Sequence, residues 1–448
     1  MLVRFRLTVD DNRSTLRSFG DTIKGNFMKT YGRRVVGAAA AGLLIAAAGV
    51  GAASARVGQV EGAGGETLTV WTYYVTGGQI DALDAQNEMF AESHPDVKID
   101  HVQIPFDQLA PRLLAGAATG DGPDVVLDNV VVDFPALAAS GALLDLTPYW
   151  DAYPDADQFP DSAVWRTDDG IFNVMSYTNL LAMYYNADIL DEYGIAPPTT
   201  IEELESAMAV VAEAGDYTPL SMSGVATPEG AWMFMPLLLS QGVGYCNLDE
   251  PSVEGAFTTL QGWADNDYIP TETATWDQAD AWLAFASGDF AFGFNGNWNL
   301  GELDGLDFTA GTVQFPSNGS EGSVVFPGGE AMGIGSFSDN PDLAWEYIES
   351  AWMSQEASLI NFTTSGQIPT RADLADAPEL QENELVQPFV AAAGSTANWP
   401  ASPNTAAMQN AMGQAGSGVI SGGLSASDAA SQVVSDVTNE IDDGGGSC

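Results

Sequence analysis

The chain has 448 residues, of which 46% are hydrophobic and 10% aromatic, so it is long enough to build two lobes rather than one core. It carries 61 Asp and Glu against 13 Lys and Arg, which gives a formal net charge of −48. A field of that sign repels nucleic acid and anionic lipid, and the scarcity of arginine disfavours a phosphate or sulfate ligand. We interpret the acids as a solvated surface, and adaptation to high salt stays open as an alternative.

The N-terminal part has the pattern of an export signal, and eight of the 13 cations precede residue 35. Residues 28–55 combine a basic start, an apolar run and the small-residue cleavage site Ala53-Ser54-Ala55. We interpret Met28 as the initiator and residues 1–27 as a misannotated extension. A retained membrane anchor and the choice between Sec and twin-arginine export stay open. No lipid-acceptor cysteine follows the apolar run, so we expect an exported protein on the extracellular or periplasmic side of the membrane.

The next hundred residues have the pattern of a parallel sheet. A Gly-rich linker at 56–66 precedes expected strands at 67–72, 97–104 and 123–127, which alternate with expected helices at 79–93 and 106–118. This order predicts helices on both faces of the sheet, with ligands bound beyond the carboxyl ends of its strands. The loop Tyr73-Tyr74 and the turn Asp128-Asn129 should then share one rim.

Later segments are predicted mainly from local signals. In AMYYNADIL (182–190) we interpret Tyr185 and Asn186 as structural, with Asn186 capping a turn. Thr200 and Glu203 form a capping box at the start of a helix over 201–214. Residues 340–353 are expected to form an amphipathic helix, and the Gly/Ser-rich residues 416–427 a loop.

Several kinds of catalytic chemistry have no sequence signature here. The chain has no P-loop, GxGxxG or GxSxG motif. The two histidines, His94 and His101, are expected in surface loops and leave little for a triad or a zinc site. The two cysteines, Cys246 and Cys448, are too few for a disulfide framework, and whether they pair is open. We expect no metal, no cofactor and no enzyme activity.

Seven stretches along residues 67–440 resemble, in order, the family 1 extracellular solute-binding proteins, the sugar-capturing subunits of ABC importers. They are TLTVWTYY (67–74), AGAATGDGPDVVL (115–127), SGALLDLTPY (140–149), MYYNADILDEYGIAPPTTIEEL (183–204), FASGDFAFGFNGNW (285–298), FPGGEAMGI (326–334) with NPDLAWEYI (340–348), and SGQIPTR (365–371). The segment ATGDGPD (118–124) is similar to the maltose-binding branch of that family.

The resemblance implies a fold of the α/β class, periplasmic-binding-protein-like. Two doubly wound α/β lobes would be joined by three crossing segments, near 173–178, 313–317 and 366–370, with a ligand cleft between them. Lobe one would comprise 66–175 and 316–366, and lobe two 176–315 and 367–441. Residues 442–448 are predicted to be a disordered tail.

The function that the resemblance implies is that of a non-enzymatic substrate-binding protein of an ABC importer. It would capture a neutral mono- or oligosaccharide by hinge closure, and then deliver it to the membrane permease as a monomer. Two alternatives stay open. One is a binding protein for a polyamine or another cationic solute, which the acidic body would favour. The other is a secreted glycoside hydrolase or lyase, because carboxylates are plentiful.

A neutral sugar needs aromatic faces for its C–H surface and polar side chains for its hydroxyl groups. From the positions that match the family pattern and the predicted rim, we expect ten residues to contact the ligand. They are the aromatic Tyr73, Tyr74, Tyr177, Trp232, Trp298 and Trp399, the polar Asp128, Asn179 and Glu330, and Gly329, at which the backbone can approach the ligand closely.

Overall fold

The computed structural model describes residues 56–59, 65–74, 77–318, 324–393, 395–400, 402–446 and 448. The predicted extension at 1–27 and the predicted signal peptide at 28–55 lie outside these residues, as does the middle of the predicted linker at 56–66. The first four residues of that linker form a strand, β1 (Arg56–Gln59), which pairs with the sheet of the first lobe. Within the described residues, no helix is long and apolar enough to span a bilayer.

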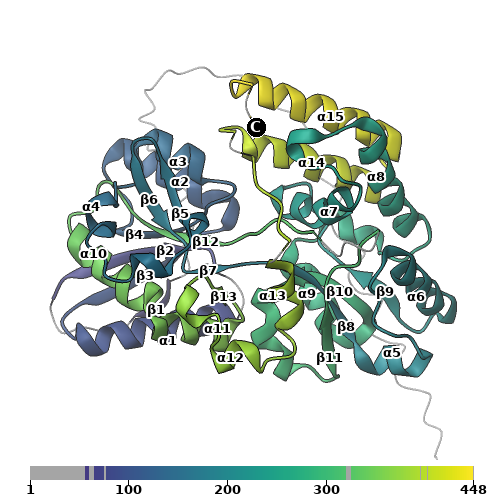
Figure 1. Cartoon of the computed structure of the whole chain (residues 1–448), viewed down its shortest axis with the longest axis horizontal. Coiled ribbons are helices and arrows are strands. Elements are labelled where there is room, and N and C mark those ends of the chain that lie inside the picture. The colour runs from purple at the N-terminus through teal and green to yellow at the C-terminus, as the bar shows by residue number, and fades with distance from the viewer. Residues whose placement is uncertain are drawn as a thin grey trace, which may run out of the picture. The chain divides into compact units, whose positions relative to one another are not determined.

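The first lobe is built on a seven-stranded sheet of order β1-β3-β2-β4-β12-β6-β5 (Figure 1). Strands β2, β3 and β4 run parallel, as predicted, whereas β12 lies antiparallel between β4 and β6. The strands are β2 (Thr67–Thr72), β3 (Lys98–Gln103), β4 (Val125–Asn129), β5 (Val164–Thr167), β6 (Gly170–Val174) and β12 (Glu330–Ile334). The helices are α1 (Gly77–Ser93), α2 (Phe106–Thr119), α3 (Phe134–Ser140), α4 (Thr147–Trp150), α10 (Pro341–Tyr347) and α11 (Gln355–Ser365).

Strand β4 shows why this sheet is covered on both faces. Its first four residues, 125–128, are fully buried, and side chains alternate between the faces of a strand. Val125 and Leu127 belong to one buried cluster, and Val126 belongs to a separate one. The apolar run Val125-Val126-Leu127 therefore fills two cores at once, which is the arrangement that a doubly wound lobe requires.

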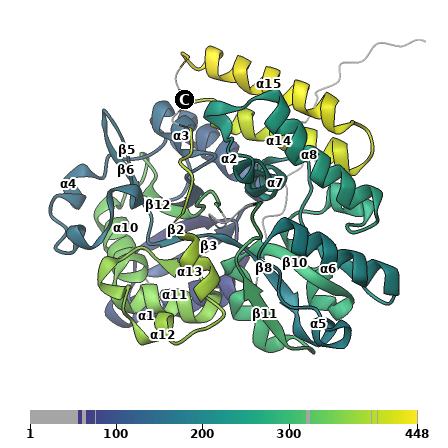
Figure 2. The ribbon, with the colours of Figure 1, turned by 45° about the vertical axis from the view of Figure 1, so that its right-hand side comes forward.

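The second lobe has a four-stranded sheet of order β11-β8-β10-β9 (Figure 1), of which Figure 2 labels β11, β8 and β10. The Asn186 side chain caps α5 by accepting hydrogen bonds from the backbone N–H groups of Asp188 and Ile189. Thr200 and Glu203 form the predicted capping box at the start of α6. The strands are β8 (Leu181–Asn186), β9 (Thr218–Ser221), β10 (Phe290–Gly296) and β11 (Ala310–Val313). The helices are α5 (Ala187–Tyr193), α6 (Ile201–Ala214), α7 (Pro228–Ser240), α8 (Glu250–Asp265), α9 (Gln278–Ala284), α12 (Pro378–Gln381), α13 (Gln387–Ala393), α14 (Thr405–Ile420) and α15 (Ala426–Asp443).

The Gly/Ser-rich residues 416–427 are not a loop throughout, because α14 continues to Ile420 and α15 begins at Ala426. Two glycines of α14 explain the difference. A side chain on Gly416 would collide with the ring of Phe234 on α7, and one on Gly413 would collide with the backbone of Thr227. The glycines serve close packing of two helices, so they do not end α14 where composition alone predicted.

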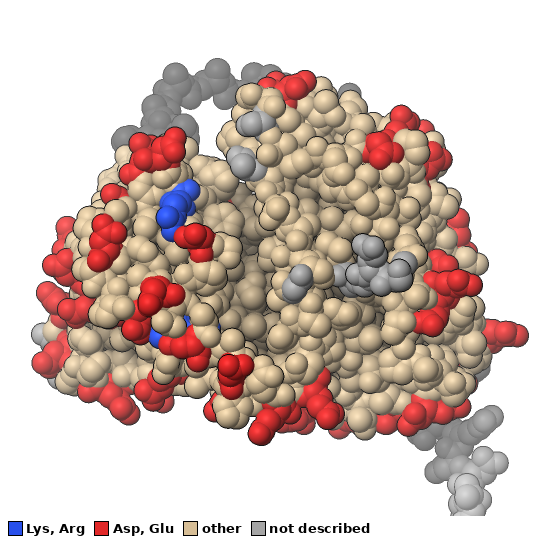
Figure 3. Space-filling view, viewed as in Figure 1, with Lys and Arg blue, Asp and Glu red and all other residues tan. Residues whose placement is uncertain are grey.

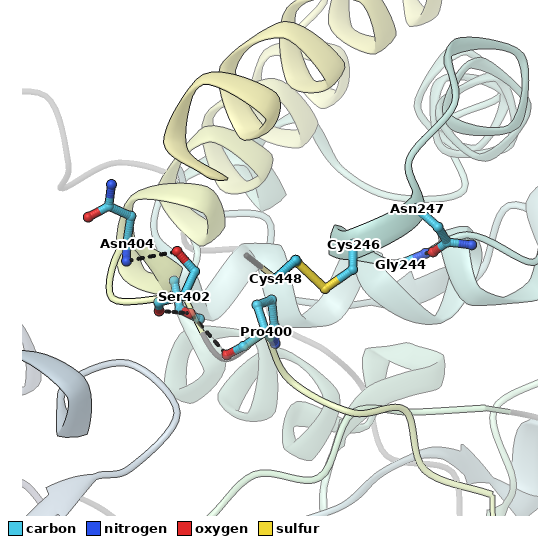
Figure 4. The surroundings of a disulfide bond; sticks show 8 residues. Gly244, Cys246, Asn247, Pro400, Ser402, Asn404 and Cys448 are labelled. Atoms are coloured by element: carbon cyan, nitrogen blue, oxygen red, sulfur yellow. Dashed lines mark hydrogen bonds between the residues drawn. A yellow bond between two sulfur atoms is a disulfide. The ribbon is translucent and has the colours of Figure 1, made fainter. Parts of the chain in front are cut away.

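The predicted disordered tail is partly helical and is tied to the second lobe. Helix α15 extends to Asp443, and Cys448 forms a disulfide with Cys246 in the short 3₁₀ helix η3 (Tyr245–Asn247) (Figure 4). The two Cα atoms lie 5.5 Å apart, although the cysteines are 202 residues apart in sequence. Whether the two cysteines pair was open from the sequence, and in the structure they form this disulfide.

Three crossing segments join the lobes and are hydrogen-bonded to one another. Strand β7 (Tyr177–Thr178) pairs antiparallel with β13 (Ile368–Pro369). Next to that pair, Asn179 and Gly328 exchange two backbone hydrogen bonds, of 2.9 and 2.7 Å. The crossings therefore form a narrow three-segment hinge rather than three independent linkers.

The middle crossing lies later in the chain than the predicted position at 313–317. Ser317 still bridges Thr200 of the second lobe, and Phe315, Val325 and Phe326 are buried in that lobe's core. The chain therefore crosses at 327–329, directly before β12. Burial of apolar side chains from an extended segment moves the boundary, and local sequence does not report such burial.

Arg371 fixes the last crossing to the first lobe. Its guanidinium is almost fully buried and lies 2.9 Å from an Asp155 oxygen and 2.7 Å from an Asp373 oxygen. It also donates to the backbone oxygen of Met353 at 2.7 Å and to the hydroxyl of Tyr153 at 3.3 Å. A planar, multiply bonded guanidinium of this kind holds the segment after β13 in one position.

The acidic residues were expected to form a solvated surface, and the two histidines were expected in surface loops. On the face shown in Figure 3, Asp and Glu lie mainly over the outer parts of the lobes, while the hollow between them is bordered mostly by uncharged residues. His101 was expected in a surface loop, but it is 3% exposed within β3 and shares a 2.7 Å hydrogen bond with Thr72. His94 follows α1 and stacks on Phe90.

Candidate ligand-binding site

A cavity of about 710 Å³ is lined by residues of both lobes and of the hinge. That volume lies within the range of roughly 300–1,000 Å³ that is usual for small-molecule sites. Seven of the ten predicted contact residues line it: Tyr73, Asn179, Trp232, Trp298, Gly329, Glu330 and Trp399. They come from the end of β2, the hinge, α7, the residues after β10, the start of β12 and the segment before α14.

Three predicted contact residues are not among the cavity-lining residues. Tyr74 and Tyr177 are each 1% exposed, and their hydroxyl groups share a hydrogen bond. Asp128 is fully buried within β4, where it accepts a hydrogen bond from the side chain of Asn173. Burial raises the pKa of Asp128, and the nearby charge of Asp133 raises it further. These three side chains are therefore buried in the protein and do not line the cavity.

Glu330 connects the first lobe to the hinge at the floor of the cavity. Its carboxylate accepts a 2.6 Å hydrogen bond from the Tyr73 hydroxyl and a 3.0 Å hydrogen bond from the Asn179 amide. Burial raises its pKa, and the hydrogen bonds from Tyr73, Tyr177 and Asn179 partly oppose that rise. The Asn179 amide oxygen is buried and has no partner among the described residues. The site therefore contains the Glu330 carboxylate, whose hydrogen bonds are already made, and the Asn179 amide oxygen, which has no partner among the described residues.

Two stacked tryptophans of the second lobe line the cavity. The rings of Trp232 and Trp298 stack with centroids 5.6 Å apart and planes at 24°. Trp298 is only 7% exposed, and a side chain on Gly296 would collide with its ring. Trp232 is half-buried. The more accessible platform is thus Trp232, with Trp298 as its backing, whereas the sequence motif drew attention to Trp298 first.

The middle crossing is held against this aromatic surface by two indole N–H groups. Trp232 donates to the carbonyl of Phe326 at 3.0 Å, and Trp399 donates to the carbonyl of Pro327. Any side chain on Gly328 would collide with the Trp232 ring. Gly329 has a φ of 145°, a conformation that glycine adopts readily. Because their N–H groups are already bonded, Trp232 and Trp399 can offer a ligand only their ring faces and edges.

Sequence reasoning missed several lining residues. The aromatic Phe106 packs edge-on against Tyr73, and Asn129 lies at the end of β4 where the shared rim was predicted. The missed amides are Gln79, Asn129, Gln278, Asn299, Gln409 and Asn410, and the missed acids are Asp133, Glu229 and Asp277. Gln409 also donates to the backbone oxygen of Val131 at 3.1 Å, which links α14 to the first lobe across the cavity. Asn299 had one available signal, since it directly follows the FNGNW motif.

Asp133 is a cavity residue whose protonation changes near neutral pH. Burial raises its pKa to about 7, so it is partly protonated near neutral pH. In an unfolded chain the same carboxyl titrates near 3.9. Between these values the folded protein binds more protons than the unfolded chain, so the free energy of unfolding falls as pH rises.

Replacing Asp133 with asparagine is therefore expected to flatten the decline in stability between about pH 4 and pH 7. At about 1.4 kcal/mol for each pH unit, the difference between the two proteins should reach roughly 2–4 kcal/mol across that window. Urea unfolding at four pH values measures it, with the exposed Asp168→Asn as the matched control. Parallel curves for Asp133→Asn and the original chain would contradict this expectation.

Among the described residues, no group of three or more His, Cys, Asp or Glu side chains is arranged to hold a metal ion. The Lys, Arg and His residues of the described chain are also absent from the cavity lining. The surface available to a ligand consists of aromatic rings, amides, a few carboxylates and backbone.

Two doubly wound lobes, a three-segment hinge and an aromatic, amide-rich cavity between the lobes define a solute-binding protein of the periplasmic type. A sequence profile described as bacterial extracellular solute-binding protein matches residues 85–388. The chain belongs to this family.

Relatives and solved structures support the same fold. An arabinooligosaccharide-binding protein of Halalkalibacterium halodurans is 26% identical over 349 residues, which span 73% of this chain and 76% of the relative. A maltotriose-binding protein of Pyrococcus abyssi is 22% identical over 363 residues, 77% and 75% of the two chains. The GacH receptor of Streptomyces glaucescens, solved unliganded and with acarbose, has a TM-score of 0.73 at 23% identity and covers 85% of this chain and 99% of its own. Maltose-bound MalE3 of T. maritima has a TM-score of 0.74 at 21% identity, with 83% and 99% covered.

Proposed function

We propose that the protein is the substrate-binding subunit of an ABC importer, that it binds a neutral mono- or oligosaccharide between its lobes, and that it performs no chemical reaction. The observation that carries the proposal is the lining of the cavity, where five aromatic rings and seven amide side chains converge. Aromatic faces suit the C–H surface of a sugar, and amides suit its hydroxyl groups. The oligosaccharide-binding relatives support the same ligand class.

A cationic solute such as a polyamine is the second candidate, because four carboxylates line the cavity: Asp133, Glu229, Asp277 and Glu330. Two acids that converge with one aromatic ring would indicate a polyamine site, whereas several aromatic rings with amides indicate a sugar site. Here Glu330 already accepts hydrogen bonds from Tyr73 and Asn179, and the amides outnumber the acids. The balance favours a sugar.

Delivery is proposed to follow lobe closure about the hinge, after which the closed form docks on the membrane permease. The protein would act as an exported monomer, with residues 28–55 as its signal peptide. Asn179 and Gly329 lie both in the cavity lining and in the crossings, and Glu330 directly follows the middle crossing. A ligand that binds these residues can therefore favour one hinge arrangement over another.

Thermal unfolding of the purified protein with a panel of candidate ligands tests the proposal. The panel contains glucose, maltose, maltotriose, arabinotriose, xylotriose, acarbose and spermidine, each in dilute buffer and in molar salt. A ligand at 100 times its Kd should stabilise the protein by about 2.7 kcal/mol. Stabilisation by one related set of sugars that are recovered intact is the expected result. A response to spermidine alone would transfer the function to polyamine capture, and cleavage of the sugar would indicate a hydrolase or lyase.

A further inference from the structure

Three asparagines alternate along the stretch Phe294-Asn295-Gly296-Asn297-Trp298-Asn299, and all three are buried, with at most 2% of each exposed. Asn295 donates to the Gln278 carbonyl at 2.9 Å and accepts from the Gly296 N–H at 2.9 Å. Asn297 accepts from the Leu180 N–H at 2.6 Å and donates to the Gly366 carbonyl at 2.8 Å. Two of the three side chains are thus fully paired with the backbone.

Asn299 differs from its two neighbours. It is 1% exposed, yet neither its amide nitrogen nor its amide oxygen has a hydrogen-bond partner among the described residues. Asn299 also lines the cavity, directly after the stacked Trp298. Leaving both halves of a buried amide unpaired costs stability, and folded proteins leave few buried polar groups in that condition.

Asn299 lies on an element that packs against the first lobe. It belongs to the 3₁₀ helix η6 (Asn297–Gly305), which packs against the start of α1. Gly78 of α1 and Gly301 of η6 both lie against the carbonyl of Thr364, so the two elements meet over the same backbone. Gln79, the next residue of α1, lines the cavity as well.

We infer that Asn299 binds a vicinal diol of the ligand, with its N–H donating to one hydroxyl and its carbonyl oxygen accepting from the adjacent hydroxyl. Two neighbouring hydroxyl groups present a donor and an acceptor side by side, which complements both halves of an amide. A carboxylate ligand group would pair only with the amide N–H, and an ammonium group only with the amide oxygen. Of these three groups the diol alone satisfies both atoms, so the inferred ligand is a sugar with two adjacent unsubstituted hydroxyls next to Asn299.

This inference rests on the proposed function and predicts opposite effects on stability and binding. Asn299→Leu replaces an unpaired amide with an apolar group of similar size, so the ligand-free protein should keep or gain thermal stability. Its affinity for the tightest-binding trisaccharide of the panel should fall about 10- to 100-fold. Asn297→Leu is the matched control, because it removes a paired amide of the same helix and should lower the thermal midpoint.

Monodeoxy derivatives of that trisaccharide identify the diol by titration calorimetry. Two adjacent deoxygenations should each weaken binding to the original chain, and should have little effect on binding to Asn299→Leu. Equal affinity of the two proteins, or the absence of a coupled adjacent pair, would overturn the diol assignment and leave the proposed function intact. A loss of thermal stability in Asn299→Leu as large as in Asn297→Leu would also overturn it. Silence of the original chain toward every sugar would overturn the proposed function and the assignment together.

Discussion

Replacing Trp232 with alanine is expected to weaken saccharide binding about 100-fold, or about 2.7 kcal/mol, while lowering the free energy of unfolding by only about 1–2 kcal/mol. The ring is half-buried, stacks on Trp298 and lines the cavity. Its removal takes away the accessible part of the aromatic platform. Much of the core beneath it stays in place, because Trp298 remains.

The variant Trp298→Ala distinguishes the buried ring that supports Trp232 from the more accessible ring that is expected to contact the ligand. Because the Trp298 ring is 7% exposed and belongs to the core of the second lobe, its removal should cost about 3–5 kcal/mol of stability in addition to affinity. Trp165→Ala is the control, since Trp165 is another half-buried tryptophan, in β5, that does not line the cavity. It should leave affinity unchanged. Calorimetric titration and urea unfolding together distinguish the three variants, and unchanged affinity in Trp232→Ala would contradict the platform.

Removing the disulfide with the double variant Cys246→Ser/Cys448→Ser is expected to lower the free energy of unfolding by about 3–5 kcal/mol. The bond closes a loop across 202 residues, and loops of this length give a cross-link close to its largest effect on the unfolded chain. The cross-link holds Cys448 beside Pro400 and Ser402 (Figure 4). Ser402 accepts backbone and side-chain hydrogen bonds there that begin α14.

Reducing agent provides the internal control for the disulfide. It should destabilise the original protein to the level of the double variant and leave the double variant unchanged. Tyr245, next to Cys246, packs on Phe326 and Trp399 with ring centroids 5.8 and 6.1 Å apart. Because these ring contacts do not involve the sulfur atoms, Trp399 should keep its place in the double variant. Ligand affinity, measured at a temperature where both proteins are folded, should then change much less than stability. Coincident unfolding curves for the oxidised protein and the double variant would show that the disulfide does not stabilise the fold, contrary to this expectation.

Features that depend on a few neighbouring residues could be predicted from the sequence. The Thr200–Glu203 capping box and the Asn186 cap are satisfied within one turn of chain, so the residues themselves determine them. The parallel order of β2, β3 and β4 follows from alternating patterns and short connections. These elements match the expectations closely.

Features that depend on distant partners could not be predicted in the same way. Tyr73 and Tyr74 are adjacent and chemically identical, and only the packing of Tyr74 against Tyr177 decides which one faces the cavity. Trp298 belongs to the recognisable motif FNGNW, but Trp232, which stacks on it, comes from the distant helix α7. The middle crossing was placed too early because Val325 and Phe326 are held by tertiary burial. The unpaired amide of Asn299 becomes visible only when its neighbours' partners are known.

The place of β12 in the first sheet has a consequence for the order of folding. This strand follows the main part of the second lobe in the chain, yet it lies between β4 and β6. A nascent chain that has not reached residue 334 therefore carries two half-sheets, each ending in an unpaired edge that can join another molecule. Completion of the first lobe waits for the second, and truncated fragments that end between β6 and β12 should aggregate rather than fold.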